Sequence, residues 1–185
     1  MPNFCYFELR ARGTREATDE LFKDMYIPDN EPDRRRMARI FEAKVKSTTE
    51  HSDGTVTVHI AGECAWSALV CMTRTSDLCY GYGHEKDWFI GIEDEVAERN
   101  LSIEVHGFEP GMSFMERIIC TPEHKLTNEC FDAFELSYSP AYGETPDDLN
   151  QMVEQYDLTD DERKQLERGE YLVTSDMDFD DWKIE

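Results

Sequence analysis

The chain has 185 residues, of which 39% are hydrophobic and 11% aromatic, so it can form a packed core and wholesale disorder is excluded. Forty-one Asp and Glu residues against 19 Lys and Arg residues give a net charge of −22, which disfavours direct binding to nucleic acid or to anionic membranes. This length suits one substantial domain with an appendage.

In chain order, the first third predicts a strand at 4–11, a helix at about 14–26 with Thr14 as a candidate N-cap, and a pair of strands at 40–48 and 55–60. In each strand apolar residues alternate with polar ones, as in a half-buried sheet. The side chains that we expect to face the core are Cys5, Phe7, Leu9, Ala11, Phe41, Ala43, Val45, Val56, Val58 and Ile60.

The middle of the chain predicts helical stretches near 64–72 and 87–99, followed by strands at 101–105, 114–120 and 130–138. The first six elements of this β-α-β-β-α-β-β-β order match the split βαβ, ferredoxin-like arrangement, when the paired helical stretches count as one. We therefore expect an α+β fold: a ferredoxin-like, mainly antiparallel sheet with helices packed on one face and the other face partly open.

The C-terminal segment differs in charge, and we place a boundary between an α+β domain at 1–143 and an acidic, partly helical tail at 144–185. The tail has 15 Asp and Glu residues against four Lys and Arg residues, a net charge of −11, which is half the total. Thr145 and Thr159 each open a sequence typical of a capped helix. The apolar stripe expected to dock on the body is Leu149, Met152, Val153 and Tyr156.

The cysteines are scattered and form no CxxC pair, and the N-terminus has no signal-peptide pattern, so we expect reduced thiols in the cytoplasm. The spacing of Cys64, Cys71 and Cys79 fits no zinc motif, and the acids at 176–181 lack the glycine of a calcium loop, so neither a metal nor a cofactor is expected. The complete set is Cys5, Cys64, Cys71, Cys79, Cys120 and Cys130.

The sequence contains no GxSxG, HExxH, GxGxxG or Walker motif, and we expect no catalytic residue and no enzyme activity. The glycine-rich stretch 80–83 lacks the lysine of a phosphate-binding loop. A Cys–His pair of Cys120 with His124 or His106 is an alternative that only the presence of these residues supports. Glu109 and Glu116 are interpreted as solvated residues at the edge of a turn.

One basic cluster, Arg34–Arg36 with Arg39, is open to two interpretations. It could contact RNA, as clustered arginines do. In a chain this acidic, pairing with the protein's own carboxylates is the interpretation we favour.

Three stretches carry a resemblance to a known family: the opening Met1-Pro2-Asn3-Phe4-Cys5, the segment Cys64-Ala65-Trp66-Ser67, and LSIEVHGFEPGMSFME at 101–116. Over residues 1–138 the chain resembles the YubB-like ferredoxin-like proteins of plasmids and phages. Phe4 stands where that family usually has Trp, and Tyr6-Phe7 replaces the usual Asn context. The resemblance implies a mobile-element origin in a bacterial host cell, and a role in dealing with host defences or in replication.

These observations lead to one functional hypothesis and two alternatives. The chain is expected to be a non-enzymatic acidic protein that binds and inhibits a host nucleic-acid-binding defence enzyme, as anti-CRISPR and anti-restriction DNA mimics do. The alternatives are an enzyme with a Cys- or carboxylate-based hydrolytic site and a structural or accessory phage protein whose acidity only solubilises it. The residues expected to contact a basic partner such as a Cas effector are Asp147, Asp148, Glu154, Asp157, Asp160, Asp161, Glu162, Asp176, Asp178, Asp180, Asp181 and Trp182.

Overall fold

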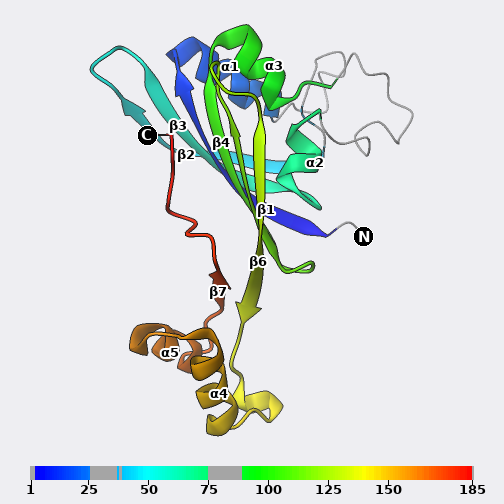
Figure 1. Cartoon of the computed structure of the whole chain (residues 1–185), viewed down its shortest axis with the longest axis vertical. Coiled ribbons are helices and arrows are strands. Elements are labelled where there is room, and N and C mark those ends of the chain that lie inside the picture. The colour runs from blue at the N-terminus through cyan, green and yellow to red at the C-terminus, as the bar shows by residue number, and fades with distance from the viewer. Residues whose placement is uncertain (1–2, 26–36, 38, 75–88, 185) are drawn as a thin grey trace.

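The computed structural model describes residues 3–25, 37, 39–74 and 89–184 and has an α+β fold (Figure 1). The cluster Arg34–Arg36 and the glycine-rich stretch 80–83 lie outside the described residues. Within the described residues, seven antiparallel strands form one continuous sheet in the order β2-β3-β1-β4-β5-β6-β7. The strands are β1 (Phe4–Gly13), β2 (Ile40–Glu50), β3 (Val56–Ala65), β4 (Ser102–Glu109), β5 (Phe114–Cys120), β6 (Thr127–Leu136) and β7 (Leu172–Ser175).

In the described part of the chain, three helices pack on one face of the sheet and enclose the main core: α1 (Arg15–Met25), α2 (Ala68–Met72) and α3 (Ile92–Arg99). Thr14 caps α1, because its hydroxyl accepts a hydrogen bond from the amide of Ala17 at 3.2 Å. The predicted alternation of β1 is confirmed: Cys5, Phe7, Leu9 and Ala11 are all buried in this core. Trp66 and Leu69 pack against it from outside.

The inward orientation predicted for Phe41 and Val45 is wrong. These side chains are 42% and 45% exposed, and only Ala43 between them is buried. β2 is an edge strand, and its register against β3 shifts between Ile40 and Glu42 and again between Val45 and Ser47. Each irregularity interrupts the two-residue period, so simple alternation does not assign the faces of this strand.

A buried carboxyl links α3 to α1. Glu95 has no exposed surface and pairs with Arg99, whose guanidinium also lies 2.9 Å from Asp24 of α1. Burial raises the pKa of Glu95 from 4.5 to about 7, although the hydrogen bond from Arg99 opposes this shift. The native state therefore binds a proton here that the unfolded state releases at lower pH.

Because the native pKa of Glu95 is the higher one, the free energy of unfolding is expected to fall as pH rises from about 4.5 to about 7, by up to about 3 kcal/mol. Glu95→Gln keeps the group neutral. The free energy of unfolding of this variant should therefore match that of the wild type at the acid end of this pH range and exceed it at the alkaline end. Urea unfolding across this range measures the effect, with Glu98→Gln, an exposed residue of the same helix, as control. An unchanged slope in Glu95→Gln would contradict it.

Beyond β6 the chain builds a small helical unit, here called the acidic lobe and defined as residues 139–170. It contains a 3-10 turn at Pro140–Tyr142, α4 (Pro146–Tyr156) and α5 (Asp160–Glu167). The predicted caps are confirmed, since Thr145 and Thr159 each form a capping box. Instead of joining the main core of the body, as expected, the apolar stripe of α4 packs on α5 and on the ends of β6 and β7. The cluster comprises Leu136, Tyr138, Leu149, Met152, Val153, Tyr156, Leu158, Leu166 and Leu172.

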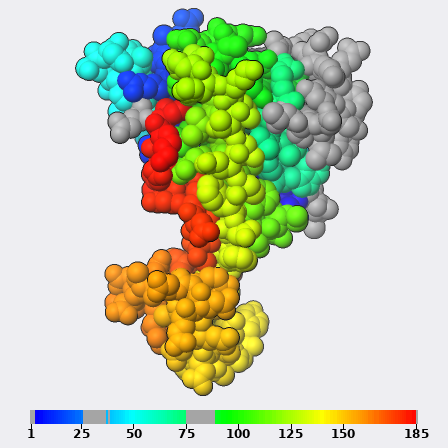
Figure 2. All heavy atoms as spheres, in the orientation of Figure 1, coloured from blue at the N-terminus to red at the C-terminus, as the bar shows by residue number. Residues whose placement is uncertain are grey.

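After the lobe, the chain returns to the sheet. β7, a strand absent from the sequence-based prediction, pairs with β6, and residues 176–184, here called the strap, run along the sheet face opposite the helices (Figure 1). In the space-filling view the lobe stands apart from the body, joined to it by a narrow waist (Figure 2). None of the described helices is long and apolar enough to cross a membrane.

Candidate functional site

The acidic lobe holds seven of the twelve residues predicted to contact a partner. Its three basic side chains are all paired within the lobe: Arg163 with Glu167 at 3.0 Å, Lys164 with Asp161 at 2.9 Å, and Arg168 with Glu170 at 2.7 Å. The lobe therefore presents an excess of carboxylates. Those predicted residues are Asp147, Asp148, Glu154, Asp157, Asp160 and Asp161, which are exposed, and Glu162, which is half-buried.

Two of these acids also hold the helices in place. Asp148 accepts hydrogen bonds from the amide and the hydroxyl of Thr145, both at 2.7 Å, and Glu162 does the same at Thr159. The pKa of Asp148 is lowered by the hydrogen bonds from the amide and the hydroxyl of Thr145. The pKa of Glu162 is lowered by those from the hydroxyl and the amide of Thr159. Both groups consequently remain charged well below neutral pH.

The other five predicted residues lie on the strap, and their surroundings differ. Asp176, Asp178 and Asp180 are exposed, whereas Asp181 lies 3.4 Å from Arg117 and 2.6 Å from Lys183. The protein's own side chains hold Trp182, the fifth. Its ring stacks on that of His106, with centroids 3.8 Å apart and planes at 10°, and the guanidinium of Arg10 lies 4.5 Å from its centre.

Below Trp182, a charged strip crosses the middle of the sheet and binds the strap. Glu104 is fully buried; it lies 2.9 Å from Nε2 of His106 and accepts the amides of Lys183 and Ile184 at 2.7 and 2.9 Å. Nδ1 of His106 donates to the carbonyl of Phe179 at 2.8 Å. Burial acts to raise the pKa of Glu104, but hydrogen bonds from His106 and from the two strap amides outweigh it, and the pKa is lowered.

Sequence reasoning missed this strip, which comprises Arg10, Glu104, His106 and Arg117. A signal was present: Glu104 and His106 occupy the polar positions of an alternating strand, and such residues all face one side. The structure does not form the Cys–His pair considered for Cys120 with His106. In the β4–β5 register His106 opposes Arg117, while Cys120 opposes Ile103 on the helix side.

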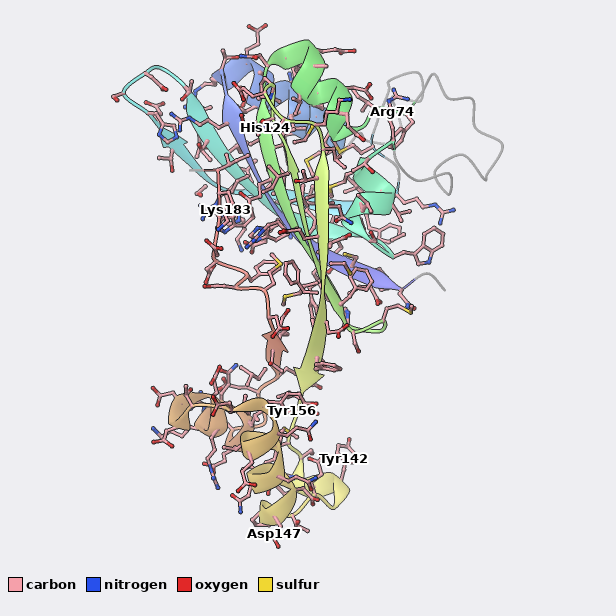
Figure 3. The ribbon with its side chains drawn as sticks, viewed as in Figure 1. Arg74, His124, Tyr142, Asp147, Tyr156 and Lys183 are labelled. Atoms are coloured by element: carbon pink, nitrogen blue, oxygen red, sulfur yellow. The ribbon has the colours of Figure 1, made fainter. Side chains whose placement is uncertain are left out.

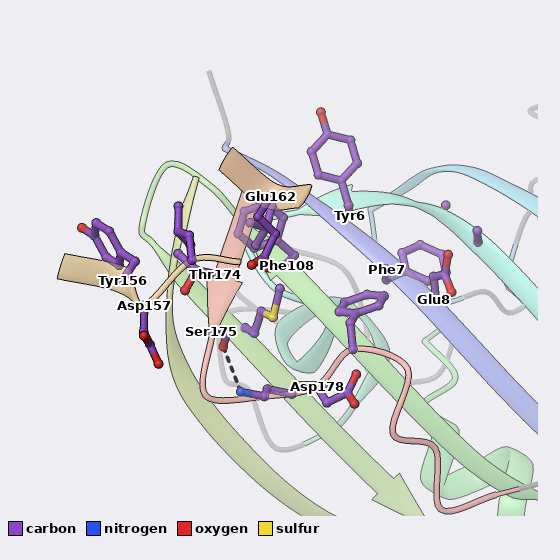
Figure 4. Close-up of a pocket in the computed structure, with 17 residues that line it drawn as sticks. Tyr6, Phe7, Glu8, Phe108, Tyr156, Asp157, Glu162, Thr174, Ser175 and Asp178 are labelled. Carbon is purple, nitrogen blue, oxygen red and sulfur yellow. Dashed lines mark hydrogen bonds between the residues drawn. The ribbon is translucent and has the colours of Figure 1, made fainter. Parts of the chain in front are cut away.

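A pocket of about 630 Å³ opens between the acidic lobe and the sheet, and the strap forms one of its walls (Figure 4). Its lining is rich in aromatic and sulfur-containing side chains, with carboxylates around them. The residues that line it are Tyr6, Phe7, Glu8, Ala61, Gly62, Phe108, Met115, Tyr156, Asp157, Leu158, Glu162, Val173, Thr174, Ser175, Met177, Asp178 and Phe179.

The segments that carry the family resemblance meet at one buried point. The amide of Trp66 donates to the carbonyl of Asn3 at 2.9 Å, and the hydroxyl of Ser67 donates to Glu116 at 2.9 Å. Glu116 is 3% exposed and Glu109 is 1% exposed, so their interpretation as solvated edge residues is wrong. Glu116 accepts hydrogen bonds from the first two amides of α2, and Glu109 accepts hydrogen bonds from the amides of Gly111 and Met112 in the turn that follows it. Each carboxylate therefore fixes a segment of backbone.

Two of the buried thiols, those of Cys64 and Cys120, are not activated. Hydrogen bonds with Cys5 and Cys71, together with burial, raise the pKa of Cys64 well above its ordinary value, and burial raises the pKa of Cys120 to about 11. A nucleophilic cysteine needs the opposite shift. These two thiols give the hydrolytic alternative no support, and within the described ranges no three His, Cys, Asp or Glu residues are grouped to hold a metal ion.

The geometry therefore offers two surfaces for a ligand, the acidic lobe and the pocket beside it, which share Asp157 and Glu162. Both are built from helices and strands with defined caps and registers. Comparison with known proteins adds nothing to these features, since no family model, curated protein or solved structure matches the chain.

Proposed function

We propose that this chain is a non-enzymatic interaction protein whose acidic lobe binds a basic, nucleic-acid-binding protein. The observation that carries the proposal is the protruding lobe, in which every Lys and Arg is paired internally while Asp147, Glu154, Asp157 and Asp160 remain exposed. Such a surface attracts arginines and lysines arranged for phosphates, and it repels nucleic acid itself.

In its specific form, the proposal is inhibition of a host defence enzyme. Carboxylates on two capped helices would take the place of phosphates in a channel built for DNA or RNA, as in anti-CRISPR and anti-restriction DNA mimics. The mobile-element origin implied by the resemblance supports this form, and the low pKa values of Asp148 and Glu162 favour a charge that persists in such a channel.

We further propose that the body is ferredoxin-like, with the lobe as an appendage to it. The strand order β2-β3-β1-β4, with α1 between β1 and β2, supports this assignment, because a split βαβ unit inserts one strand between two that a helix connects. β5 and β6 extend the sheet towards the lobe.

Binding to a purified Cas effector complex or restriction enzyme is expected to weaken at least about tenfold between about 50 and about 200 mM salt, because the contacts are ionic. Neutralising the lobe with D147N, E154Q, D157N and D160N should weaken binding at low salt by a similar factor. The matched control neutralises four exposed acids of the body with E16Q, D19N, E98Q and E123Q. Salt-independent binding, or equal effects of the two variants, would count against the proposal.

A further inference from the structure

The pocket between the lobe and the sheet combines an apolar interior with an acidic rim. Its volume of about 630 Å³ lies within the range of about 300–1,000 Å³ typical of ligand sites. Apolar atoms come from all sides: Phe108 and Met115 from the sheet, Met177 and Phe179 from the strap, and Tyr156 from the lobe. No Lys or Arg is among the described residues that line it.

Four carboxylates line the pocket, and three of them have partners within the chain. Glu8 lies 2.8 Å from Nε2 of His59, and Glu162 caps α5 through Thr159. Asp178 accepts the amide of Asp180 at 2.9 Å; it and Asp157 are exposed, and no described basic side chain lines the pocket to neutralise their charge. The site is therefore complementary to a ligand that is both apolar and positively charged.

The same pocket is lined by three consecutive residues of β7, Val173 to Ser175. β7 is the last strand in the sheet order, so in the described part of the chain no further strand covers its outer edge. A strand edge can pair with the backbone of an extended peptide, whose alternate side chains then enter neighbouring pockets. This geometry favours an extended chain over a helix as the occupant.

We infer that the pocket binds an extended segment of the partner protein in which basic residues alternate with apolar ones. The apolar side chains enter between Tyr6, Phe108 and Tyr156, and the basic ones meet Asp157 and Asp178 at the rim (Figure 4). The inference rests on the proposed function and adds to it a specific contact, since the lobe alone supplies attraction without selecting a sequence.

Two fluorescent peptides of equal charge test the inference by anisotropy with the full-length protein. In one, arginine alternates with leucine; in the other, arginine alternates with serine. The Arg–Leu peptide should bind at least about tenfold more tightly, because its leucine side chains bury apolar surface in the pocket that serine side chains lack. Equal affinities would overturn the inference.

Matched variants locate the contact. Tyr6 and Phe4 lie on the same face of β1 and are 48% and 49% exposed, but only Tyr6 lines the pocket. Tyr6→Ser should lower the affinity for the Arg–Leu peptide about tenfold, and Phe4→Ser should leave this affinity unchanged. Likewise, Asp178→Lys at the rim should lower the affinity for this peptide more than Asp147→Lys at the far tip of the lobe does (Figure 3). Equal effects within either pair would overturn the pocket assignment.

The results separate this inference from the proposed function. Suppose that both peptides bind equally, bind less tightly at high salt and bind the Tyr6→Ser variant as well as the wild type. The proposed binding by the acidic lobe is then supported and the pocket assignment fails. If the Arg–Leu peptide binds in a Tyr6-dependent way while the Cas effector and the restriction enzyme do not bind, the pocket assignment stands and the proposed function fails.

Discussion

Glu116→Ala is expected to lower the free energy of unfolding by about 3–5 kcal/mol, because it leaves buried donors without an acceptor. The carboxylate accepts hydrogen bonds from the hydroxyl of Ser67 at 2.9 Å and from the amides of Ala68 and Leu69, and it is 3% exposed. Without it, α2 begins at unsatisfied amides inside the core. Chemical denaturation measures the loss.

Two control variants make this result specific. Glu116→Gln keeps an acceptor oxygen in the same place, so it should restore most of the stability, to within about 1–2 kcal/mol of the wild type. Glu135→Ala, at an exposed position of β6, should change stability by less than about 0.5 kcal/mol. If Glu116→Ala is no more harmful than Glu135→Ala, the carboxylate does not anchor α2.

Features that depend on near neighbours in the chain were predictable from the sequence. The capping boxes at Thr145 and Thr159 join residues three positions apart, and the alternation of Cys5 to Ala11 repeats every second residue. The order of the helices and strands from β1 to β6 follows from the same local patterns. The lobe's charge could be found by counting, because exposed carboxylates need no partner within the fold.

Features that depend on distant partners were not predictable in this way. The burial of Glu116 is compensated by a hydrogen bond from Ser67, which is 49 residues away in the chain. The burial of Glu104 is compensated by a hydrogen bond from the amide of Ile184, which is 80 residues away. A buried carboxylate looks like a surface residue in the sequence, since its compensating donors are not adjacent. The same reason explains why the sequence indicates the acidic lobe but not the pocket. The pocket depends on a distant contact, since one of its walls is the strap that returns to the sheet.

Trp182→Ala is expected to release the strap and to lower the free energy of unfolding by about 2–4 kcal/mol. The variant removes the ring that stacks on His106 at 3.8 Å and lies under Arg10 at 4.5 Å. It thereby weakens the hold on the amides of Lys183 and Ile184, which donate to Glu104. Faster hydrogen exchange at these two amides, with the β1–β4 ladder still protected, would demonstrate local release.

The same variant shows whether Trp182 serves the fold or a partner. If it serves the fold, Trp182→Phe should keep the strap in place, because a phenyl ring can still stack on His106. The strap supplies Met177, Asp178 and Phe179 to the pocket, so its release in Trp182→Ala should weaken the Arg–Leu peptide about tenfold while the salt-dependent attraction of the lobe persists. Protected strap amides in Trp182→Ala would contradict the internal role, and a loss of partner binding without release would make Trp182 a direct anchor.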